Sequence, residues 1–470
     1  MTSIAIYSEA LRNVIKEITE KYYKVEIKND LGMTILKELI QNANDASAKT
    51  LDFGYHKGNL NSNNPLLRNP GLFFINDGEF SSRDLISIHT MWASGKSENP
   101  DQIGKFGLGL KSVFNWCETF FYFSSGISDS FKTPAIKKKY KDKDKYDVFN
   151  PWSPTPEEEE LQQGLKTPEE IRPYPEWSNV ESKDHDFITT ELHNIIKNHN
   201  QWFCIWIPLR KIINEIKAPF KKSYPGDNIN FPNVFEKKQL RYELLSILPF
   251  MSNLNTITYW NQGSKKYSIN CNFNLPTIKK DDDEIILPQK SKVYLDNDFV
   301  YNFISYKYEN YHQTNMLNSH SDFPTDEDKK PEETFNQGAI SISLIKEKDV
   351  TGCIILDWCV FLPLSDRILE KECKGYTIHI KLHGWFFIDS GRTKVDFGED
   401  ETNLTIKQKW NRTIATQNTL PQLIPVIDKI INSGAENSVI DDIANTLEQS
   451  ELYSQHWMKE GICVKDSLLN

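Results

Sequence analysis

A glycine-rich stretch in the first third of the chain has the residue types of an anion-binding loop. Gly104, Gly107 and Gly109 allow a backbone to approach a phosphate group closely, because glycine has no Cβ. A helix is expected to begin just after them, and its free N–H groups and positive dipole end would attract the anion. The spacing indicates a phosphate-binding loop, although by itself it is a weak signal.

Two familiar phosphate-binding loops are excluded by the context of these glycines. A dinucleotide-binding loop opens a βαβ unit, and this stretch does not follow the start of such a unit. A Walker A loop closes with Gly-Lys and then Ser or Thr, whereas this stretch continues as Leu110-Lys111-Ser112.

Two polar motifs earlier in the chain strengthen the interpretation of this loop. Glu38, Asn42 and Asp45 stand at positions i, i+4 and i+7 of a predicted helix and therefore share one of its faces. Asp77 ends an apolar run and is followed by Gly78, so its carboxylate can accept a hydrogen bond from an exocyclic amine. Taken singly, the first motif is typical of a solvated helix face and the second of a turn.

The three motifs, in this order and at these spacings, resemble the signature of the GHKL ATPases, the superfamily of gyrase, the heat-shock-ninety chaperones, histidine kinases and MutL. Within it the chain most resembles the sacsin-type branch, through ELIQNANDA, FINDGEFSSRDL, IGKFGLGLKSVFNW and FFYFSSG. Further similar segments are WIPLR, VFLPLS, HGWFFIDSGRTKV and WNRTIATQNTLPQLIPVID. The resemblance extends over most of residues 1–430 and is weak in 127–200 and 261–350.

The resemblance implies a site for ATP and Mg²⁺. Glu38 would be the general base that activates the attacking water, and Asn42 would hold the magnesium ion that bridges the phosphates. Asp77 would accept the adenine amino group, with Asp45 supporting that end of the pocket. The nucleotide-binding residues that it implies are Asn42, Asp45, Ala46, Asp77, Gly78, Lys96, Gly104, Phe106, Gly107, Leu108, Gly109 and Lys111.

The second domain of such proteins often supplies a basic residue to the γ-phosphate. Arg392 and Lys394 follow the apolar run GWFFID and are the catalytic candidates of this kind, because positive charge stabilises the transition state of phosphoryl transfer. An ordinary basic hairpin remains the alternative interpretation, as a solvated lysine does for Lys96 and Lys111.

The chain departs from the pattern of the superfamily at the end of the pocket that would bind adenine. The acidic motif at 77–80 reads DGEF rather than DxGxG, a departure that sacsin-type sequences share. Trp202 and Phe203 stand where a Gly-Thr pair usually begins the closing strand. We therefore expect altered nucleotide affinity and slow ATP hydrolysis, with Glu38 still in place.

A sheet and helices must position these motifs. Apolar patterns predict helices at 4–22, 33–46 and 81–91, and strands near 50–55, 72–77, 119–125 and 203–209. The expected fold class is α+β: an N-terminal GHKL (Bergerat) α/β sandwich with a mixed, mostly antiparallel sheet, then a second α+β domain and a helical tail. We expect the ATP-binding domain in 1–126 and 200–235, a partly irregular insertion or linker in 127–199, a transducer-like domain in 236–400 and the tail in 401–470.

Composition and charge limit the class of protein. The net charge is −10, which argues against a dominant nucleic-acid surface. The seven cysteines are scattered without a CxxC pair, so zinc and a disulfide framework are not expected. No apolar run approaches the ~20 residues that span a bilayer, and the charged start is unlike a signal peptide, so we expect a cytoplasmic protein without membrane contact.

The sequence leaves open what the ATP is for. The first hypothesis is a chaperone-like ATPase whose domains close around ATP and act on a protein client. The second is a nucleotide-gated subunit of a prokaryotic anti-phage defence complex, and the third is a DNA-acting ATPase like MutL, which the acidic charge disfavours. An ATP-dependent homodimer is also expected, with the helix at 4–22 as a candidate for exchange.

Overall fold

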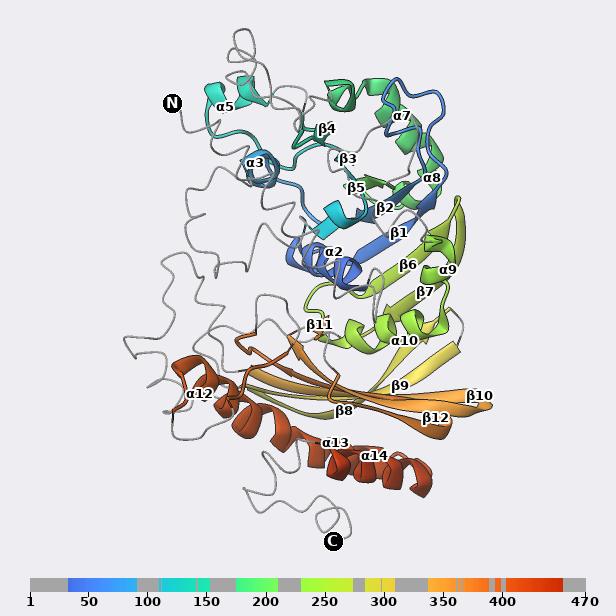
Figure 1. The fold of residues 1–470 in the computed structure, drawn as a ribbon, viewed down its shortest axis with the longest axis vertical. Coiled ribbons are helices and arrows are strands. Elements are labelled where there is room, and N and C mark those ends of the chain that lie inside the picture. Colours follow the sequence, from blue (N-terminus) through green and yellow to red (C-terminus); the bar gives the residue numbers. More distant parts are fainter. Residues whose placement is uncertain are drawn as a thin grey trace. The chain divides into compact units, whose positions relative to one another are not determined.

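The computed structural model describes most of the chain and divides it into two parts. The described residues are 33–90, 110, 112–140, 143–152, 175–209, 230–273, 284–296, 298–308, 337–360, 362–364, 367–388, 394–398 and 403–450. Unit 1 comprises Met1–Leu240 and Thr256–Ser268, and unit 2 comprises Arg241–Asn255 and Ile269–Asn470. Each unit combines helices with strands (Figure 1), so the chain is α+β as predicted.

Unit 1 is built on a mixed, mostly antiparallel sheet. Its strands are β1 (Thr50–His56), β2 (Gly71–Asn76), β3 (Phe120–Ser124), β4 (Tyr146–Phe149), β5 (Phe203–Pro208), β6 (Thr256–Asn261) and the part of β7 (Ser264–Cys271) that ends at Ser268. The order across the sheet is β7-β6-β1-β2-β5-β3-β4. β1 pairs in parallel with β6, whereas its pairing with β2 and those of β2 with β5, β5 with β3 and β3 with β4 are antiparallel.

The predicted helices at 33–46 and 81–91 are both present in unit 1. α2 (Met33–Asp45) is amphipathic, and Leu36, Leu39 and Ala43 are buried on its apolar face. α3 (Ser82–Thr90) begins after Ser81, whose hydroxyl donates to Asp84 and accepts from the Asp84 amide, and this exchange caps the first turn. A short 3-10 turn, η1 (Ser112–Asn115), precedes β3.

The described parts of 127–199, which the sequence predicts to be a partly irregular insertion or linker, contain several regular elements. It contributes α5 (Pro134–Lys139), β4, the 3-10 turn η2 (Pro175–Ser178), α7 (Ser182–Glu191) and α8 (His193–Ile196) to unit 1. Ile188, Leu192 and Ile195 are buried at helical spacing, and Trp177 of η2 is completely buried. A few large apolar side chains thus anchor these elements, while the many charges around them hide the pattern in the sequence.

Unit 2 combines long strands with a helical C-terminal part. The strands are β8 (Glu284–Leu295), β9 (Asp298–Tyr308), β10 (Gln337–Val360), β11 (Leu362–Pro363) and β12 (Leu369–Gly384). The helical segments are α12 (Ile406–Thr413), the π-helical turn η6 (Ile414–Thr419), η7 (Leu420–Gln422), α13 (Leu423–Ile431) and α14 (Asn437–Gln449). α9 (Phe231–Phe235) belongs to unit 1, and α10 (Lys238–Ile247) belongs to unit 2 from Arg241 onward, followed by η4 (Leu248–Phe250).

The two faces of the unit 2 sheet differ in chemistry. On one face Ile342 of β10 and Ile380 of β12 belong to an apolar core that includes α13 and α14, which lie along this side of the sheet (Figure 1). Side chains alternate between the faces of a strand, so Ser343, His379 and Lys381 point to the other face. These three polar side chains are also buried, and the second face is therefore polar as well as buried.

Candidate functional site

The end of α2 and the loop after β2 meet in unit 1. The Glu79 amide donates to the Ala46 carbonyl at 3.3 Å, and the Gly78 amide donates to Asn76 Oδ1 at 3.0 Å. A Cβ at Gly78 would lie 2.6 Å from the Ala46 carbonyl oxygen, so this approach requires glycine. The structure thus brings together Ala46 and Gly78, which the sequence assigned to one nucleotide site from separate motifs.

The polar stripe of α2 lies on the side of the helix away from its buried residues. Glu38 is half-buried, and Asn42 and Asp45 are exposed. Because these residues recur at helical spacing, they share the accessible face of α2. The helix ends at Asp45, directly before Ala46, which contacts Gly78. A water-activating carboxylate and a metal-holding amide oxygen could both act from this face.

Asp77 is anchored through one of its carboxylate oxygens. Oδ1 accepts hydrogen bonds from the Lys49 amide at 2.8 Å and the Thr50 amide at 2.9 Å, which fixes the start of β1 against the end of β2. Oδ2 lies 3.9 Å from Nδ1 of His199, and the Asp77 side chain is 21% exposed. Asp77 therefore supports the local fold with one oxygen and keeps the other for further contacts.

His199 is a residue of this region that the sequence interpretation missed. Its Nε2 lies 3.7 Å from Oδ2 of Asp52, and the side chain is only 11% exposed. Trp260 Nε1 donates to the other oxygen of Asp52 at 2.7 Å. Asp52 raises the pKa of His199 above its ordinary value, with help from Asp77 and against the lowering effect of burial. No motif surrounds His199, so only its position just before Trp202 could have drawn attention to it.

Two aromatic residues, Trp202 and Phe203, pack at the start of β5. Phe203 pairs with Asn76, the residue before Asp77, and its ring lies 4.6 Å from that of Phe80. Trp202 is buried, its carbonyl accepts from the Ser125 amide at 3.0 Å, and its ring stacks on His185. Phe203 and Phe80 therefore form an apolar wall beside the Asp77 loop.

Much of the predicted phosphate end lies outside the described residues. This applies to Lys96, Gly104, Phe106, Gly107, Leu108, Gly109, Lys111 and Arg392. Lys394 is described and is exposed in unit 2, next to Val395, which forms a β-bridge with Ile388. Within the described ranges no cluster of three or more His, Cys, Asp or Glu has a metal-binding arrangement. A magnesium ion held by Asn42 and phosphate oxygens would not form such a cluster.

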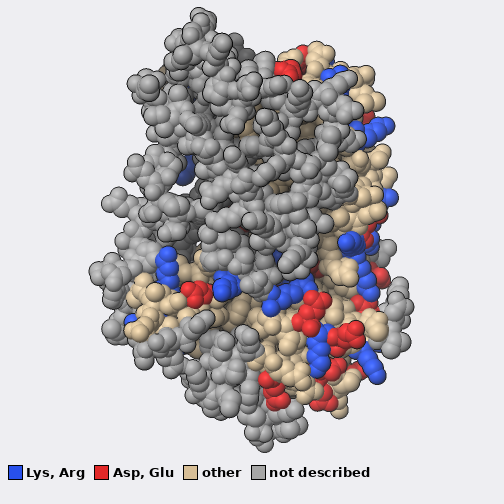
Figure 2. All heavy atoms as spheres, in the orientation of Figure 1, with Lys and Arg blue, Asp and Glu red and all other residues tan. Residues whose placement is uncertain are grey.

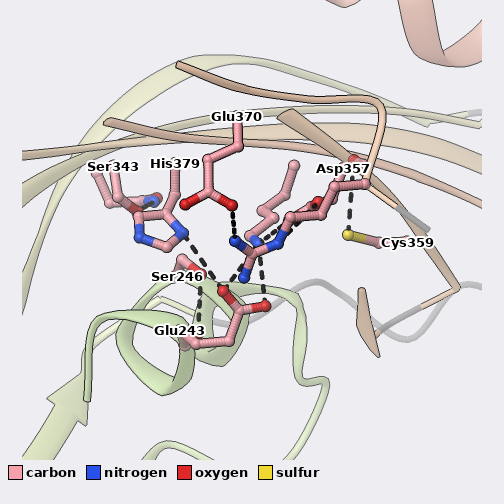
Figure 3. Close-up of polar contacts among 10 residues, drawn as sticks. Glu243, Ser246, Ser343, Asp357, Cys359, Glu370 and His379 are labelled. Carbon is pink, nitrogen blue, oxygen red and sulfur yellow. Dashed lines mark hydrogen bonds and ion pairs between the residues drawn. The ribbon is translucent and has the colours of Figure 1, made fainter. Parts of the chain in front are cut away.

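Unit 2 contains a second group of charged side chains on its polar sheet face (Figure 3). Lys381 Nζ donates to Oε1 and Oε2 of Glu243 at 3.1 and 3.2 Å, and it also donates to Asp357 Oδ2. His379 Nδ1 lies 3.5 Å from Glu243 Oε2. Arg367 Nε lies 3.9 Å from Asp357 Oδ1 at the more exposed edge of the group.

This second group is suited to holding the fold rather than to meeting a substrate. The Lys381 side chain has no exposed surface, and those of Asp357 and Glu243 are 1% and 8% exposed. Burial would lower the pKa of Lys381, but Asp357 and Glu243 outweigh that effect and raise it, so Lys381 keeps its proton. A permanently charged, fully enclosed ammonium group binds its neighbours and does not exchange protons with a ligand.

The face drawn in Figure 2 shows no basic stripe among the described residues. Lys and Arg side chains alternate there with Asp and Glu.

Comparison with known proteins points in the same direction as the motifs. The sequence model of the family described as Sacsin domain matches residues 8–271, which include all described residues of unit 1. Sacsin of Homo sapiens is 35% identical over 115 residues, which cover 23% of this chain and 2% of Sacsin. The chain therefore spans a small part of the length of this relative. In the described part of the chain, no helix combines the length and apolar character needed to cross a membrane.

Proposed function

This chain belongs to the Sacsin domain family, whose sequence model matches residues 8–271 of its 470, and we propose that unit 1 binds ATP with Mg²⁺ and hydrolyses the ATP slowly. The proposal includes the GHKL type of fold for this unit. ATP-driven closure onto a protein client, as in a chaperone, is the output that we propose for it.

The contact between Ala46 and the 77–79 loop is the observation that supports this proposal most. The contact joins the C-terminal end of α2 to the loop that begins with Asp77 after β2, and α2 also carries Glu38 and Asn42. A polar helix face and a strand-end carboxylate thus border the same region of unit 1. A nucleotide needs such a combination, because its base offers an amine and its phosphates require a metal ion and a positioned water.

Each described residue has a definite task in this proposal. Asp77 accepts the adenine amine, Asn42 contributes an oxygen to the magnesium ion, and Glu38 takes a proton from the attacking water. The magnesium ion supplies charge neutralisation on the phosphates when it is bound. Phe203 stands where the superfamily usually has a threonine, so the pocket lacks that hydroxyl, and we therefore propose weaker or less selective base binding and slow turnover.

Calorimetric titration of the full chain with ATP and Mg²⁺, followed by phosphate-release assays, tests the proposal. The variant Glu38→Gln should bind ATP like the parent chain and lose turnover by about 10²-fold or more, because it keeps the shape of the side chain but not its basicity. Glu176→Gln, at an exposed glutamate of η2, is the matched control and should change neither quantity. Failure of the parent chain to bind ATP would refute the proposed function, and unchanged turnover in Glu38→Gln would remove Glu38 from its role.

A further inference from the structure

The two carboxylate oxygens of Asp77 differ in their hydrogen-bond partners. Oδ1 already accepts two backbone N–H groups, from Lys49 at 2.8 Å and from Thr50 at 2.9 Å. A carboxylate oxygen offers about two lone pairs, so Oδ1 has no acceptor capacity left in this arrangement. An amine that binds Asp77 must therefore use Oδ2, and Oδ2 is the oxygen that faces Nδ1 of His199 at 3.9 Å.

His199 stands between two carboxylates from neighbouring strands. Asp52 on β1 approaches Nε2 at 3.7 Å, and Asp77 after β2 approaches Nδ1 at 3.9 Å. These are the charged groups that act on the ring among the described residues. Trp260 Nε1 holds the other oxygen of Asp52 at 2.7 Å and so fixes that carboxylate in place. With 11% of its side chain exposed, His199 is enclosed enough for both charges to act strongly.

We propose that His199 is a positioning residue that controls how well Asp77 accepts the amine of an adenine base. The inference rests on the proposed function and adds to it a residue that the motifs do not contain. In its protonated form the imidazolium places a positive charge 3.9 Å from Oδ2, the atom that the base amine needs. In its neutral form with the proton on Nε2, facing Asp52, the ring leaves Oδ2 to the base.

The direction of the effect follows from the charge of the ring. A positive charge 3.9 Å from Oδ2 reduces the strength of this oxygen as an acceptor for a second donor, so protonation of His199 weakens adenine binding. Asp52 and Asp77 favour the protonated form and raise the pKa of His199 above its ordinary value. Nucleotide affinity is then expected to rise as pH rises through the titration of His199. By linkage, bound nucleotide must favour the neutral ring.

The dissociation constant of Mg²⁺–ATP, measured from about pH 5.5 to 8.5, tests this inference. Relative to the parent chain, His199→Gln should remove about a tenfold change in affinity over this range, because glutamine does not titrate. His193→Gln, at an exposed histidine of α8, is the control and should keep the pH dependence of the parent chain. The phosphates of ATP titrate alike with all three proteins, so the difference between their affinity curves gives the contribution of His199 to the pH dependence.

A second measurement avoids any dependence on a variant that does not fold. The chemical shift of a His199 ring proton, measured by NMR against pH in the parent chain, should show the titration of His199 at a lower pH when ATP and Mg²⁺ are present. Asp52→Asn should shift the same titration to lower pH without ATP. Absence of ATP binding at every pH would overturn the proposed function itself. Binding with the same pH dependence in His199→Gln, or a His199 titration that ATP does not move, would overturn this inference alone.

Discussion

Lys381 Nζ lies 3.1 Å from Oε1 of Glu243, a residue 138 positions away in the sequence. The contact joins α10 to β12, and Asp357 of β10 completes the group from the neighbouring strand. All three charges are almost fully buried. Removing such charges from water is costly, and their mutual attraction compensates only while the set is complete. The stability of unit 2 should therefore depend on whether one partner or all partners are removed.

The first prediction concerns Lys381 alone and in combination. Lys381→Met should destabilise the chain by about 3–5 kcal/mol, because Glu243 and Asp357 would face each other without a cation. The triple change Lys381→Met, Glu243→Leu and Asp357→Leu should recover most of that loss, since it leaves no unpaired charge. Urea unfolding monitored by tryptophan fluorescence measures both free energies.

An exposed lysine on the same strand serves as the control for this prediction. Lys371 of β12 is exposed and bonds to Gln449 at 3.1 Å. Lys371→Met should change the free energy of unfolding by no more than about 0.5 kcal/mol. A single Lys381→Met variant as stable as the parent chain would show that the buried carboxylates do not need their cation.

The second prediction is a loss of stability in mild acid caused by His379. Burial, reinforced by the charge of Lys381, lowers the pKa of His379 from 6.5 to about 3. The folded state therefore binds fewer protons than the unfolded state between these values. The contribution of neutral His379 to the free energy of unfolding is complete above pH 6.5 and is lost as the pH falls toward about 3. A buried neutral histidine of this kind adds up to about 1.4 kcal/mol per pH unit to the slope of the unfolding free energy against pH.

Unfolding experiments between about pH 5 and 6.5 detect this slope. His379→Gln should flatten the dependence of the unfolding free energy on pH, even if its stability at neutral pH differs from that of the parent chain. The exposed His193 provides a control, because His193→Gln should leave the slope as it is. An equally steep slope in His379→Gln would assign the acid sensitivity to other groups.

Local apolar patterns predict the described elements that carry the first two motifs. The run LFFIN became β2, whose residues Leu72–Ile75 are all buried, and the amphipathic spacing of 33–46 became α2. In α7 and α8 the apolar side chains at 188, 192 and 195 are too few among charged neighbours to produce a clear period. The sequence of 182–196 therefore resembles that of a linker, although this stretch forms α7 and α8.

Polar residues that act through distant partners could not be predicted in the same way. A lysine in a strand normally indicates an exposed position, yet Lys381 is buried because Glu243 and Asp357 reach it from other elements. His199 lies in no recognisable motif, and its relation to Asp52 and Asp77 exists only once β1 and β2 are adjacent. Asp77 is a candidate from the sequence because it ends an apolar run and matches the GHKL-like motif, and its role stays a prediction.

The third prediction separates the two tasks of Asp77. In Asp77→Asn the amide oxygen can still accept the N–H groups of Lys49 and Thr50, so the local fold should persist. The amide nitrogen then replaces Oδ2 and presents a donor where the adenine amine also donates. We expect ATP affinity to fall by about 10- to 100-fold, while the free energy of unfolding changes by less than about 1 kcal/mol.

Asp77→Ala completes this test because it removes both oxygens. The amides of Lys49 and Thr50 would lose their acceptor, which should lower the free energy of unfolding by about 1–3 kcal/mol in addition to the loss of ATP binding. Asp186→Asn, at an exposed aspartate of α7, should affect neither measurement. If Asp77→Asn bound ATP as tightly as the parent chain, Asp77 would be only an anchor for β1, and the base would have to be recognised elsewhere.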